Sequence, residues 1–307
     1  MGKRKLPPPA TRPGVLFIHG DCCEALRALI AVGVRVDSII MDPAYESLER
    51  HRAKGTTTRL SQSKASSNKW FPTFPNARYW ELFPLLYNVL LGDGYLHSWA
   101  DVETTCAILT GRCPFHKPTD RALKEILVRH GADCCWEIEG QDWTAWPWFP
   151  WVKTKIAHDV DPLFDEVDLD YHLAQTGMGY HWRRCHEEVL VFEKGHRALK
   201  DPSLPGLLLG PRATKDDYPT AKPIEAYERI ILNTTDPGDL VLDPFAGSGN
   251  CGIAALKHGR RAILIDVEHS GVYDTFRDAG LLHELLYLWG KPVDAAALDK
   301  MTNRIGA

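Results

Sequence analysis

The stretch LVLDPFAGSGN, residues 240–250, has residue types suited to binding a nucleoside. An apolar strand would bring the chain to the carboxyl edge of a parallel sheet, where ligands bind, and Gly247 and Gly249 would let the backbone come close to a ligand. Asp266 ends the next apolar run, where an acid can accept hydrogen bonds from ribose hydroxyls. Neither the G-x-G-x-x-G pattern nor a P-loop lysine is present. A nucleoside-type cofactor is therefore predicted, with a plain tight turn as the alternative.

A second stretch, IIMDPAYESL (39–48), ends an apolar run in Asp42, Pro43, Ala44 and Tyr45. Asp and Pro are common in turns, and a tyrosine often packs beside one. Taken alone, the pattern predicts a turn at the end of a strand. Its order relative to the glycine loop is what gives it a further meaning.

The elements around both stretches alternate between strand and helix patterns. Strand–helix–strand order implies parallel pairing, so we expect an α/β fold with a mostly parallel sheet flanked by helices. Apolar periodicity predicts strands over 14–21, 36–42, 92–100, 240–243 and 261–266, and helices over 22–33, 79–90, 120–131, 222–235 and 251–259.

Composition excludes several classes of protein. The chain has 307 residues, 44% hydrophobic and 25% charged, with a net charge of −4, so it is not a uniformly cationic nucleic-acid binder. No apolar run has the roughly 18 residues of a membrane span, and no signal peptide follows the basic start, so a cytoplasmic protein without membrane contact is expected. The eight cysteines match no disulfide pattern and are expected to be reduced. No metal site is expected; the alternative is zinc at Cys113, His116, Cys134 and Cys135.

Four stretches, in this order, resemble S-adenosylmethionine-dependent DNA amino-methyltransferases. IIMDPAY (39–45) resembles the catalytic D-P-P-Y motif, with Ala44 in place of the second proline. The segment GMGYHWRRCHEEVLVFEKG (177–195) resembles the family's middle region, YPTAKP (218–223) its T-x-K-P segment, and DLVLDPFAGSGN (239–250) its cofactor loop. Catalytic motif first and cofactor loop last is the permuted order of the β class. The resemblance covers about 15–265 and implies a Rossmann-like methyltransferase fold.

The resemblance implies S-adenosylmethionine as the cofactor and relates individual residues to its parts. Asp243 would serve the amino-acid end, Asp266 the ribose, and Asp21, in the sequence HGD, would lie near the adenine. Thr220 and Lys222 match the segment that closes over the methionine part, with a surface lysine as the alternative for Lys222. The loop residues expected to contact the cofactor are Phe245, Ala246, Gly247 and Gly249.

The resemblance also implies that Asp42, Pro43 and Tyr45 are catalytic. The amine of adenine is a poor nucleophile because its lone pair is delocalised into the ring. The Asp42 carboxylate and the Pro43 carbonyl would accept hydrogen bonds from its two N–H groups. Tyr45 would stack on a base flipped out of the duplex, which offsets part of the cost of flipping. Asp in the first motif position goes mostly with adenine in this family. N6 of adenine is therefore the predicted target, and N4 of cytosine is the alternative.

Residues 46–71 are predicted to form a basic loop that contacts DNA. The segment 196–219, where the family usually reads DNA, is too short for a sizeable recognition domain. The 46–71 stretch is long, polar and without apolar periodicity, and it offers side chains for phosphates and base edges; a solvated loop is the alternative. Its basic residues are Arg50, Arg52, Lys54, Arg59, Lys64 and Lys69.

The resulting organisation is a catalytic domain over 14–270, with a Trp-rich and acidic insertion over 136–176, and a helical tail over 271–307. In the insertion, Trp143 and Trp146 could lie at a subunit interface or touch DNA. The β class is often dimeric, which implies a homodimer or higher homo-oligomer with double-stranded DNA as partner.

Two other classes of function remain as rivals. One is methyl transfer to an RNA or protein amine, where related enzymes use N-P-P-Y; Asp42 and the permuted motif order argue against it. The other is an inactive DNA-binding regulator that keeps only the fold. The intact Asp42, Tyr45 and glycine loop argue against that.

Overall fold

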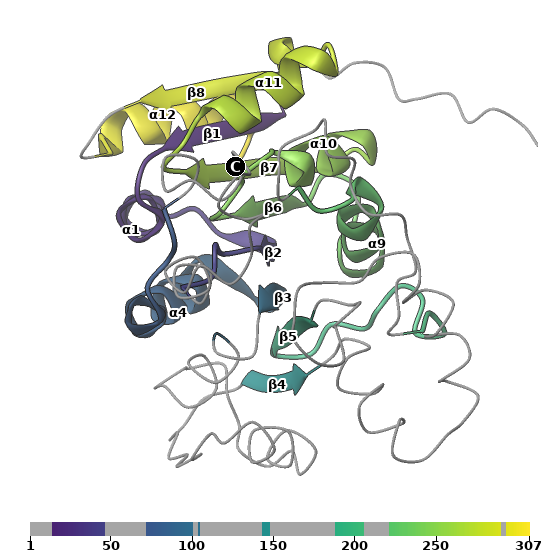
Figure 1. Cartoon of the computed structure of the whole chain (residues 1–307). Helices are drawn as coiled ribbons and strands as arrows, with labels where there is room; N and C mark the ends of the chain where they lie inside the picture. The colour runs from purple at the N-terminus through teal and green to yellow at the C-terminus, as the bar shows by residue number, and fades with distance from the viewer. Residues whose placement is uncertain are drawn as a thin grey trace, which may run out of the picture.

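The computed structural model describes residues 14–46, 72–100, 104, 143–147, 188–205, 221–289 and 293–307. Within these residues, an 8-stranded sheet runs in the order β4-β5-β3-β2-β6-β7-β1-β8 (Figure 1). Neighbours from β3 through β8 pair in parallel, whereas β5 is antiparallel to both β3 and β4. The predicted α/β fold with a mostly parallel sheet is confirmed.

The elements follow the predicted alternation closely. The strands are β1 (Val15–His19), β2 (Val36–Met41), β3 (Leu90–Ala100), β4 (Trp143–Pro147), β5 (Glu188–Lys194), β6 (Leu240–Asp243), β7 (Arg261–Asp266) and β8 (Leu285–Trp289). The α-helices are α1 (Cys22–Ala31), α4 (Tyr79–Val89), α9 (Ile224–Thr234), α10 (Asn250–Lys257), α11 (Ser270–Asp278) and α12 (Ala295–Ile305). Short 3₁₀ helices are η2 (Asn76–Arg78) and η3 (Leu282–Glu284).

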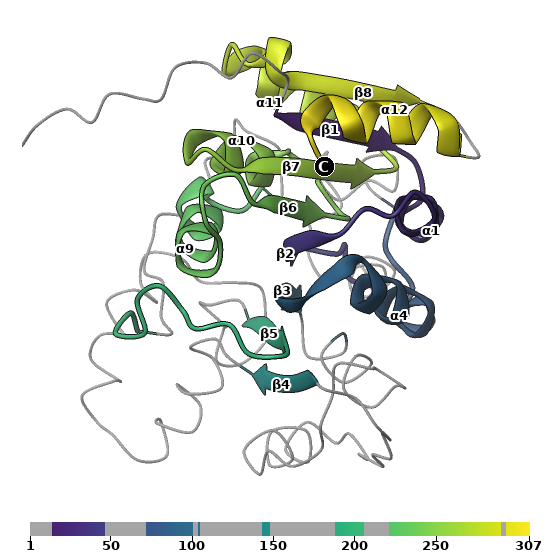
Figure 2. The ribbon, with the colours of Figure 1, turned by 180° about the vertical axis from the view of Figure 1, so that it is seen from behind.

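The sheet lies between two layers of helices. Helices α1, α4 and α12 cover one face and α9, α10 and α11 the other, as the two opposite views show (Figures 1 and 2). Each layer seals its own apolar cluster against the sheet. Burial on both faces explains why the central strands are almost continuously apolar, since a parallel sheet keeps no solvent-facing side.

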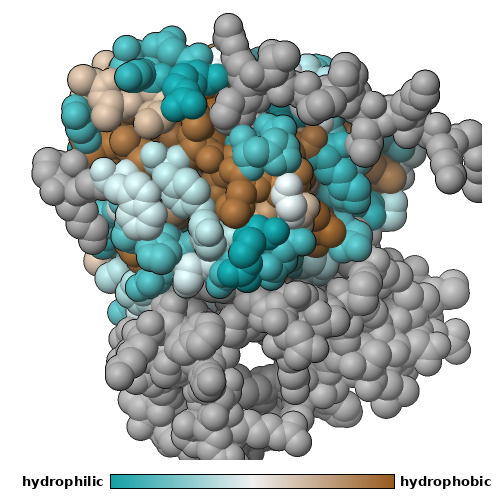
Figure 3. All heavy atoms as spheres, turned by 90° about the horizontal axis from the view of Figure 1, so that it is seen from above, coloured by the Kyte–Doolittle hydropathy of each residue, from teal (hydrophilic) through white to brown (hydrophobic). Residues whose placement is uncertain are grey.

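The C-terminal tail differs from the prediction. Residues 271–307 were expected to be helical, but LLYLW (285–289) forms β8 and pairs in parallel with β1, from Val15↔Leu285 to His19↔Trp289. The physical reason is that five apolar and aromatic residues favour a strand, and β1 would otherwise be the edge of the sheet. The view from above Figure 1 shows apolar residues interspersed with hydrophilic ones on this face of the molecule (Figure 3).

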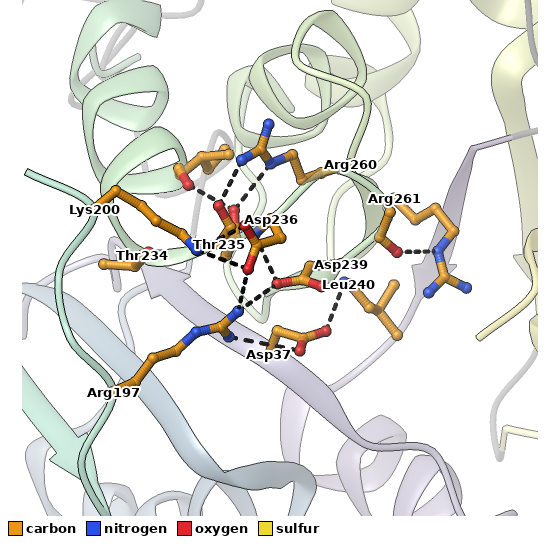
Figure 4. Close-up of polar contacts among 12 residues, drawn as sticks. Asp37, Arg197, Lys200, Thr234, Thr235, Asp236, Asp239, Leu240, Arg260 and Arg261 are labelled. Atoms are coloured by element: carbon orange, nitrogen blue, oxygen red, sulfur yellow. Dashed lines mark hydrogen bonds and ion pairs between the residues drawn. The ribbon is translucent and has the colours of Figure 1, made fainter.

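The amino-terminal ends of β2 and β6 are held by a polar network (Figure 4). Arg197 pairs with Asp236 and Asp239 at 3.1 and 2.9 Å, and its Nη1 lies 3.7 Å from Asp37. The Asp37 carboxylate accepts the backbone N–H of Leu240 at 2.9 Å. This network lies at the edge of the sheet opposite to the carboxyl ends of the strands, so its role is to hold the sheet together.

Three predictions fall largely or wholly outside the described residues. The helix expected over 120–131 and the basic residues of 46–71 lie outside them. The 136–176 insertion is described only at 143–147, where the backbone of β4 pairs with β5. In the part of the chain that the structure describes, no helix is long and apolar enough to cross a membrane.

Candidate active site

Four carboxylates line the carboxyl edge of the sheet. Asp42 follows β2, Asp243 ends β6, Asp266 ends β7, and Asp21 follows β1. These strands are neighbours in the order β2-β6-β7-β1, and parallel strands end at the same edge. The structure therefore brings together residues that the sequence separates by more than 200 positions.

The glycine loop folds against the end of β7. Asp266 Oδ2 accepts the N–H of Gly247 at 2.7 Å, and its Oδ1 accepts the N–H of Glu268 at 2.9 Å. Gly247 and Gly249 have φ of 49° and 81°, in the left-handed region that favours glycine. A Cβ on Gly249 would also lie 3.3 Å from the Cα of Val272. Both glycines are therefore needed for the turn, and they keep the loop backbone bare.

Asp243 is a fully buried acid with an incomplete set of hydrogen bonds. Its Oδ1 accepts the N–H of Phe245 at 3.0 Å. Among the described residues, no N–H or O–H donates to Oδ2, and the thiol of Cys251 offers a weak S–H donor. Burial, with Asp266 and Asp42 nearby, raises the pKa of Asp243 well above its ordinary value. Such a carboxylate would be stabilised by a cationic group of a ligand.

Asp42 is held at both of its oxygens by donors from two parts of the chain. The Tyr45 hydroxyl donates to Oδ1 at 3.1 Å. The ammonium of Lys222 lies 3.1 Å from Oδ2, and the Lys222 and Asp42 side chains are only 10% and 17% exposed. The two side chains predicted to be catalytic, Asp42 and Tyr45, are thus joined by a direct hydrogen bond.

Lys222 connects the turn at Asp42–Tyr45 to the glycine loop. Its backbone carbonyl accepts a hydrogen bond from Asn250 Nδ2 at 2.9 Å, and Asn250 is the first residue of α10. The residue is 9% exposed, so the alternative of a surface lysine is wrong. Its predicted contact with the methionine part of a cofactor stays a prediction, and Thr220 lies outside the described residues.

Sequence reasoning missed the segment around Phe74, which forms hydrogen bonds with the turn at residues 42–46. Phe74 donates its N–H to the Ala44 carbonyl at 2.7 Å, and Asn76 donates its N–H to Glu46 Oε2 at 2.6 Å. The Phe74 ring is 6% exposed and meets the Phe245 ring edge-on, with 5.0 Å between centroids. No motif marks Phe74 in the sequence, because its contacts are with residues far from it along the chain.

Arg78 is a second residue that the sequence did not reveal. It binds Asp21 with two hydrogen bonds, from Nη1 to Oδ2 at 2.7 Å and from Nη2 to Oδ1 at 2.9 Å. The guanidinium of Arg78 lowers the pKa of Asp21. It also lies 5.1 Å from the centre of the Phe74 ring. Asp21 additionally caps α1 through the N–H groups of Cys23 and Glu24, so its orientation is set from two sides.

The predicted DNA-contacting residues are not placed by the structure. Arg50, Arg52, Lys54, Arg59, Lys64 and Lys69 all lie in 47–71, outside the described residues. What the structure does describe are the two ends of this stretch, which meet at the Ala44–Phe74 and Glu46–Asn76 hydrogen bonds.

Comparison with known proteins identifies a family. The sequence model of the DNA methylase family N6_N4_Mtase matches residues 36–277. The putative methylase YubD of Escherichia coli (strain K12) is 40% identical over 82 residues, which are 27% of this chain and 36% of YubD. DNA adenine methyltransferase YhdJ of the same organism is 48% identical over 52 residues, 17% of this chain and 18% of YhdJ. The matches therefore span well under two thirds of these relatives.

The fold is also found among solved structures. The crystal structure of the M1.HpyAVI-SAM complex superposes with a TM-score of 0.50 and 17% sequence identity, over 86% of this chain and 98% of that one. At this level of identity the likeness concerns the fold alone. It agrees with the Rossmann-like methyltransferase fold that the motif order implies.

Proposed function

The chain belongs to the N6/N4 DNA methylase family, and from this premise we propose that it transfers a methyl group from S-adenosylmethionine to N6 of a flipped-out adenine in duplex DNA. The observation that carries the proposal is the contact of Asp42 with Tyr45 on the same sheet edge as Asp243 and Asp266. The sheet thus brings two further acids, at the ends of β6 and β7, to the edge where this turn lies.

The residues at the edge of the sheet fit S-adenosylmethionine. Asp243, buried and incompletely hydrogen-bonded, suits the ammonium of the methionine part, and Asp266 at the end of β7 suits the ribose hydroxyls. The bare backbone at Gly247 and Gly249 permits close approach, with Phe245 and Ala246 beside it. Asp21, which follows β1 and is held by Arg78, would lie near the adenine. When bound, the cofactor supplies an electrophilic methyl group on a sulfonium.

The catalytic turn would prepare the amine for attack. The Asp42 carboxylate and the Pro43 carbonyl accept hydrogen bonds from the two N–H groups of the target amine. These hydrogen bonds favour the pyramidal form of the amine, and the carboxylate balances the positive charge that develops on it. The Tyr45 hydroxyl, 3.1 Å from Asp42 Oδ1, keeps the carboxylate oriented. The Tyr45 ring offers a stacking surface for the base. The Ala44 carbonyl accepts the N–H of Phe74, a hydrogen bond that a proline at this position would also accept, so the departure from D-P-P-Y leaves this contact intact.

Adenine is the preferred target, and cytosine N4 is the second candidate. Asp42 in the first position of the motif favours adenine, and the relative YhdJ is named a DNA adenine methyltransferase. The family as a whole includes both N6 and N4 chemistry by its name, which keeps the second candidate open.

Duplex DNA is the proposed partner, with 46–71 as the contacting loop. The pinned ends of this stretch, at Glu46 and Asn76, support a loop that departs from and returns to the catalytic turn. A homodimer or higher homo-oligomer and a cytoplasmic location stay predictions; sedimentation of the full chain would measure the oligomeric state.

One assay tests the function. Purified protein is given tritiated S-adenosylmethionine with duplex DNA, RNA or a protein mixture, and Asp42→Ala is the control. We expect label in DNA alone, recovered as N6-methyladenine after digestion, and none with Asp42→Ala, whose folded state is checked by circular dichroism because Lys222 loses its partner. Recovery of N4-methylcytosine would select the second candidate. Label only in RNA or protein, or none, would overturn the proposal. Sequencing of modified bases from expressing cells then gives the recognition site.

A further inference from the structure

We infer that, in the enzyme without DNA, the ammonium of Lys222 occupies the position on Asp42 that the target amine takes during methyl transfer, so that Lys222 must withdraw when the base enters. The inference rests on the proposed function. It concerns one contact, between Lys222 Nζ and Asp42 Oδ2 at 3.1 Å.

The two oxygens of Asp42 are already engaged in the described structure. Oδ1 accepts the Tyr45 hydroxyl, and Oδ2 faces the Lys222 ammonium. An exocyclic amine and an ammonium are both N–H donors that approach a carboxylate oxygen at about 3 Å. The ammonium therefore satisfies Oδ2 in the way that the base amine would. A carboxylate oxygen can accept two hydrogen bonds, so the conflict between the two donors arises from the charge of the ammonium.

The charge of Lys222 explains why both cannot stay during the reaction. The target nitrogen becomes positive as it attacks the methyl group, and Asp42 is there to balance that charge. A fixed ammonium about 4 Å from this nitrogen would repel it, slowing transfer on the order of a thousandfold in a partly buried site. Lys222 is only 10% exposed, so solvent screens this repulsion weakly.

Lys222 can leave Asp42 without moving its backbone. The carbonyl of Lys222 is tied to Asn250 at 2.9 Å, next to the glycine loop. A flexible stem of four carbons separates the Lys222 backbone from the ammonium. Rotation about its bonds is therefore enough to release the Asp42 carboxylate. In the DNA-free state the same contact removes the cost of a buried, unpaired Asp42.

The first test needs no DNA and no activity. Lysines of the full chain are acetylated with a limiting amount of acetic anhydride and quantified by mass spectrometry. We expect Lys222 to react at least tenfold more slowly than Lys257, which is 54% exposed, and to react several-fold faster in Asp42→Asn. Asp236→Asn, on the opposite edge of the sheet, is the matched control and should leave Lys222 unchanged. Equal Lys222 labelling in Asp42→Asn and the parent would overturn the inference.

The second test measures entry of the base. A duplex carries 2-aminopurine at the target position of the recognition site found by sequencing, and its fluorescence rises when the base leaves the stack. Lys222→Met keeps an unbranched side chain, one atom shorter and without charge, and it should raise the fluorescence of bound DNA about threefold or more. In Lys222→Arg the fluorescence should stay at the parent level, because this variant keeps a positive charge beside Asp42.

The outcomes separate this inference from the proposed function. Unchanged or lower fluorescence in Lys222→Met, at equal thermal stability, would show that Lys222 does not compete with the base. Weaker cofactor binding with unchanged fluorescence would assign Lys222 to the cofactor and also overturn the inference. If Lys222→Met does not fold, Lys222→Gln takes its place. A failure to methylate DNA would sink the proposed function, while the acetylation result would still decide the Lys222–Asp42 contact.

Discussion

The backbone N–H of Phe74 donates a hydrogen bond to the carbonyl oxygen of Ala44 at 2.7 Å, which joins the catalytic turn to the chain that returns after residues 47–71. The Phe74 ring also packs edge-on against the ring of Phe245 in the glycine loop. One residue therefore contacts both loops of the active site, and its substitution should affect cofactor binding as well as stability.

Phe74→Leu should weaken binding of S-adenosylmethionine up to about tenfold, because loss of an aromatic pair removes roughly 0.5–1.5 kcal/mol beyond the buried area. Calorimetric titration measures this. Phe83→Leu is the matched control, since Phe83 is buried against Phe192 and Tyr79 rather than Phe245. Both variants should lose similar thermal stability. Equal cofactor affinity in the two variants would contradict the role of Phe74.

Asp243→Asn should stabilise the unliganded protein at neutral pH and weaken cofactor binding. Burial raises the pKa of Asp243 well above 3.8, so the folded state keeps a proton that the unfolded state has lost. Its contribution to stability is therefore greatest at low pH and falls as pH rises above that ordinary value. The neutral amide escapes this loss, but it cannot release a proton to become the carboxylate that would pair with an ammonium, and cofactor affinity should fall roughly 10- to 100-fold.

Urea unfolding at pH 4 and 7, with calorimetric titration of the cofactor at pH 7, checks both halves of this prediction. Asp266→Asn serves as the comparison, because both oxygens of Asp266, unlike Oδ2 of Asp243, already accept backbone N–H groups. An Asp243→Asn variant that binds cofactor as tightly as the parent would remove Asp243 from the binding site.

Replacing Arg50, Arg52 and Arg59 together by Gln should weaken DNA binding and flatten its dependence on salt. Each phosphate contact contributes about 0.9 to the slope of log K against log salt concentration, so the slope should fall by up to about 2.7. Titration of labelled duplex at several salt concentrations measures the slope. Gln at the exposed residues Arg277, Lys300 and Arg304 of α11 and α12 is the control. The same affinity and slope in the 46–71 variant would leave this stretch as a solvated loop.

His97→Leu should remove part of the protein's sensitivity to acid. His97 is 5% exposed in β3, and burial lowers its pKa to about 3. The unfolded state takes up a proton near pH 6.5 and the folded state does not, so stability is lost as pH falls below that value. Between pH 7 and 5 this residue should cost the parent about 2 kcal/mol.

Urea unfolding of the parent and His97→Leu at pH 7 and 5 gives this difference directly. The matched control is His196→Leu, whose side chain is 86% exposed in the parent. The control should lose as much stability as the parent between the two pH values. A His97→Leu variant that does the same would show that another group governs the acid response.

The sequence by itself determined the α/β class, the family, and the alternation of strands and helices around the two motifs. Apolar runs 240–243 and 261–266 match β6 and β7 residue for residue, because a strand buried on both faces leaves little freedom in where it begins and ends. The motifs that follow those strands must then meet at one edge of the sheet. Asp266 could be named as a site residue for that reason, whereas Asp42 and Asp243 were named from the family resemblance of their motifs.

Only the tertiary structure decided which side chains complete the site. Lys222 reaches Asp42, Arg78 reaches Asp21, and Phe74 reaches both loops, in each case across a separation that no periodicity spans. The strand β8 in a tail expected to be helical has the same cause, since its pairing depends on the exposed edge of β1. Local patterns record what a segment buries, whereas long-range contacts depend on which segments the folded sheet places side by side.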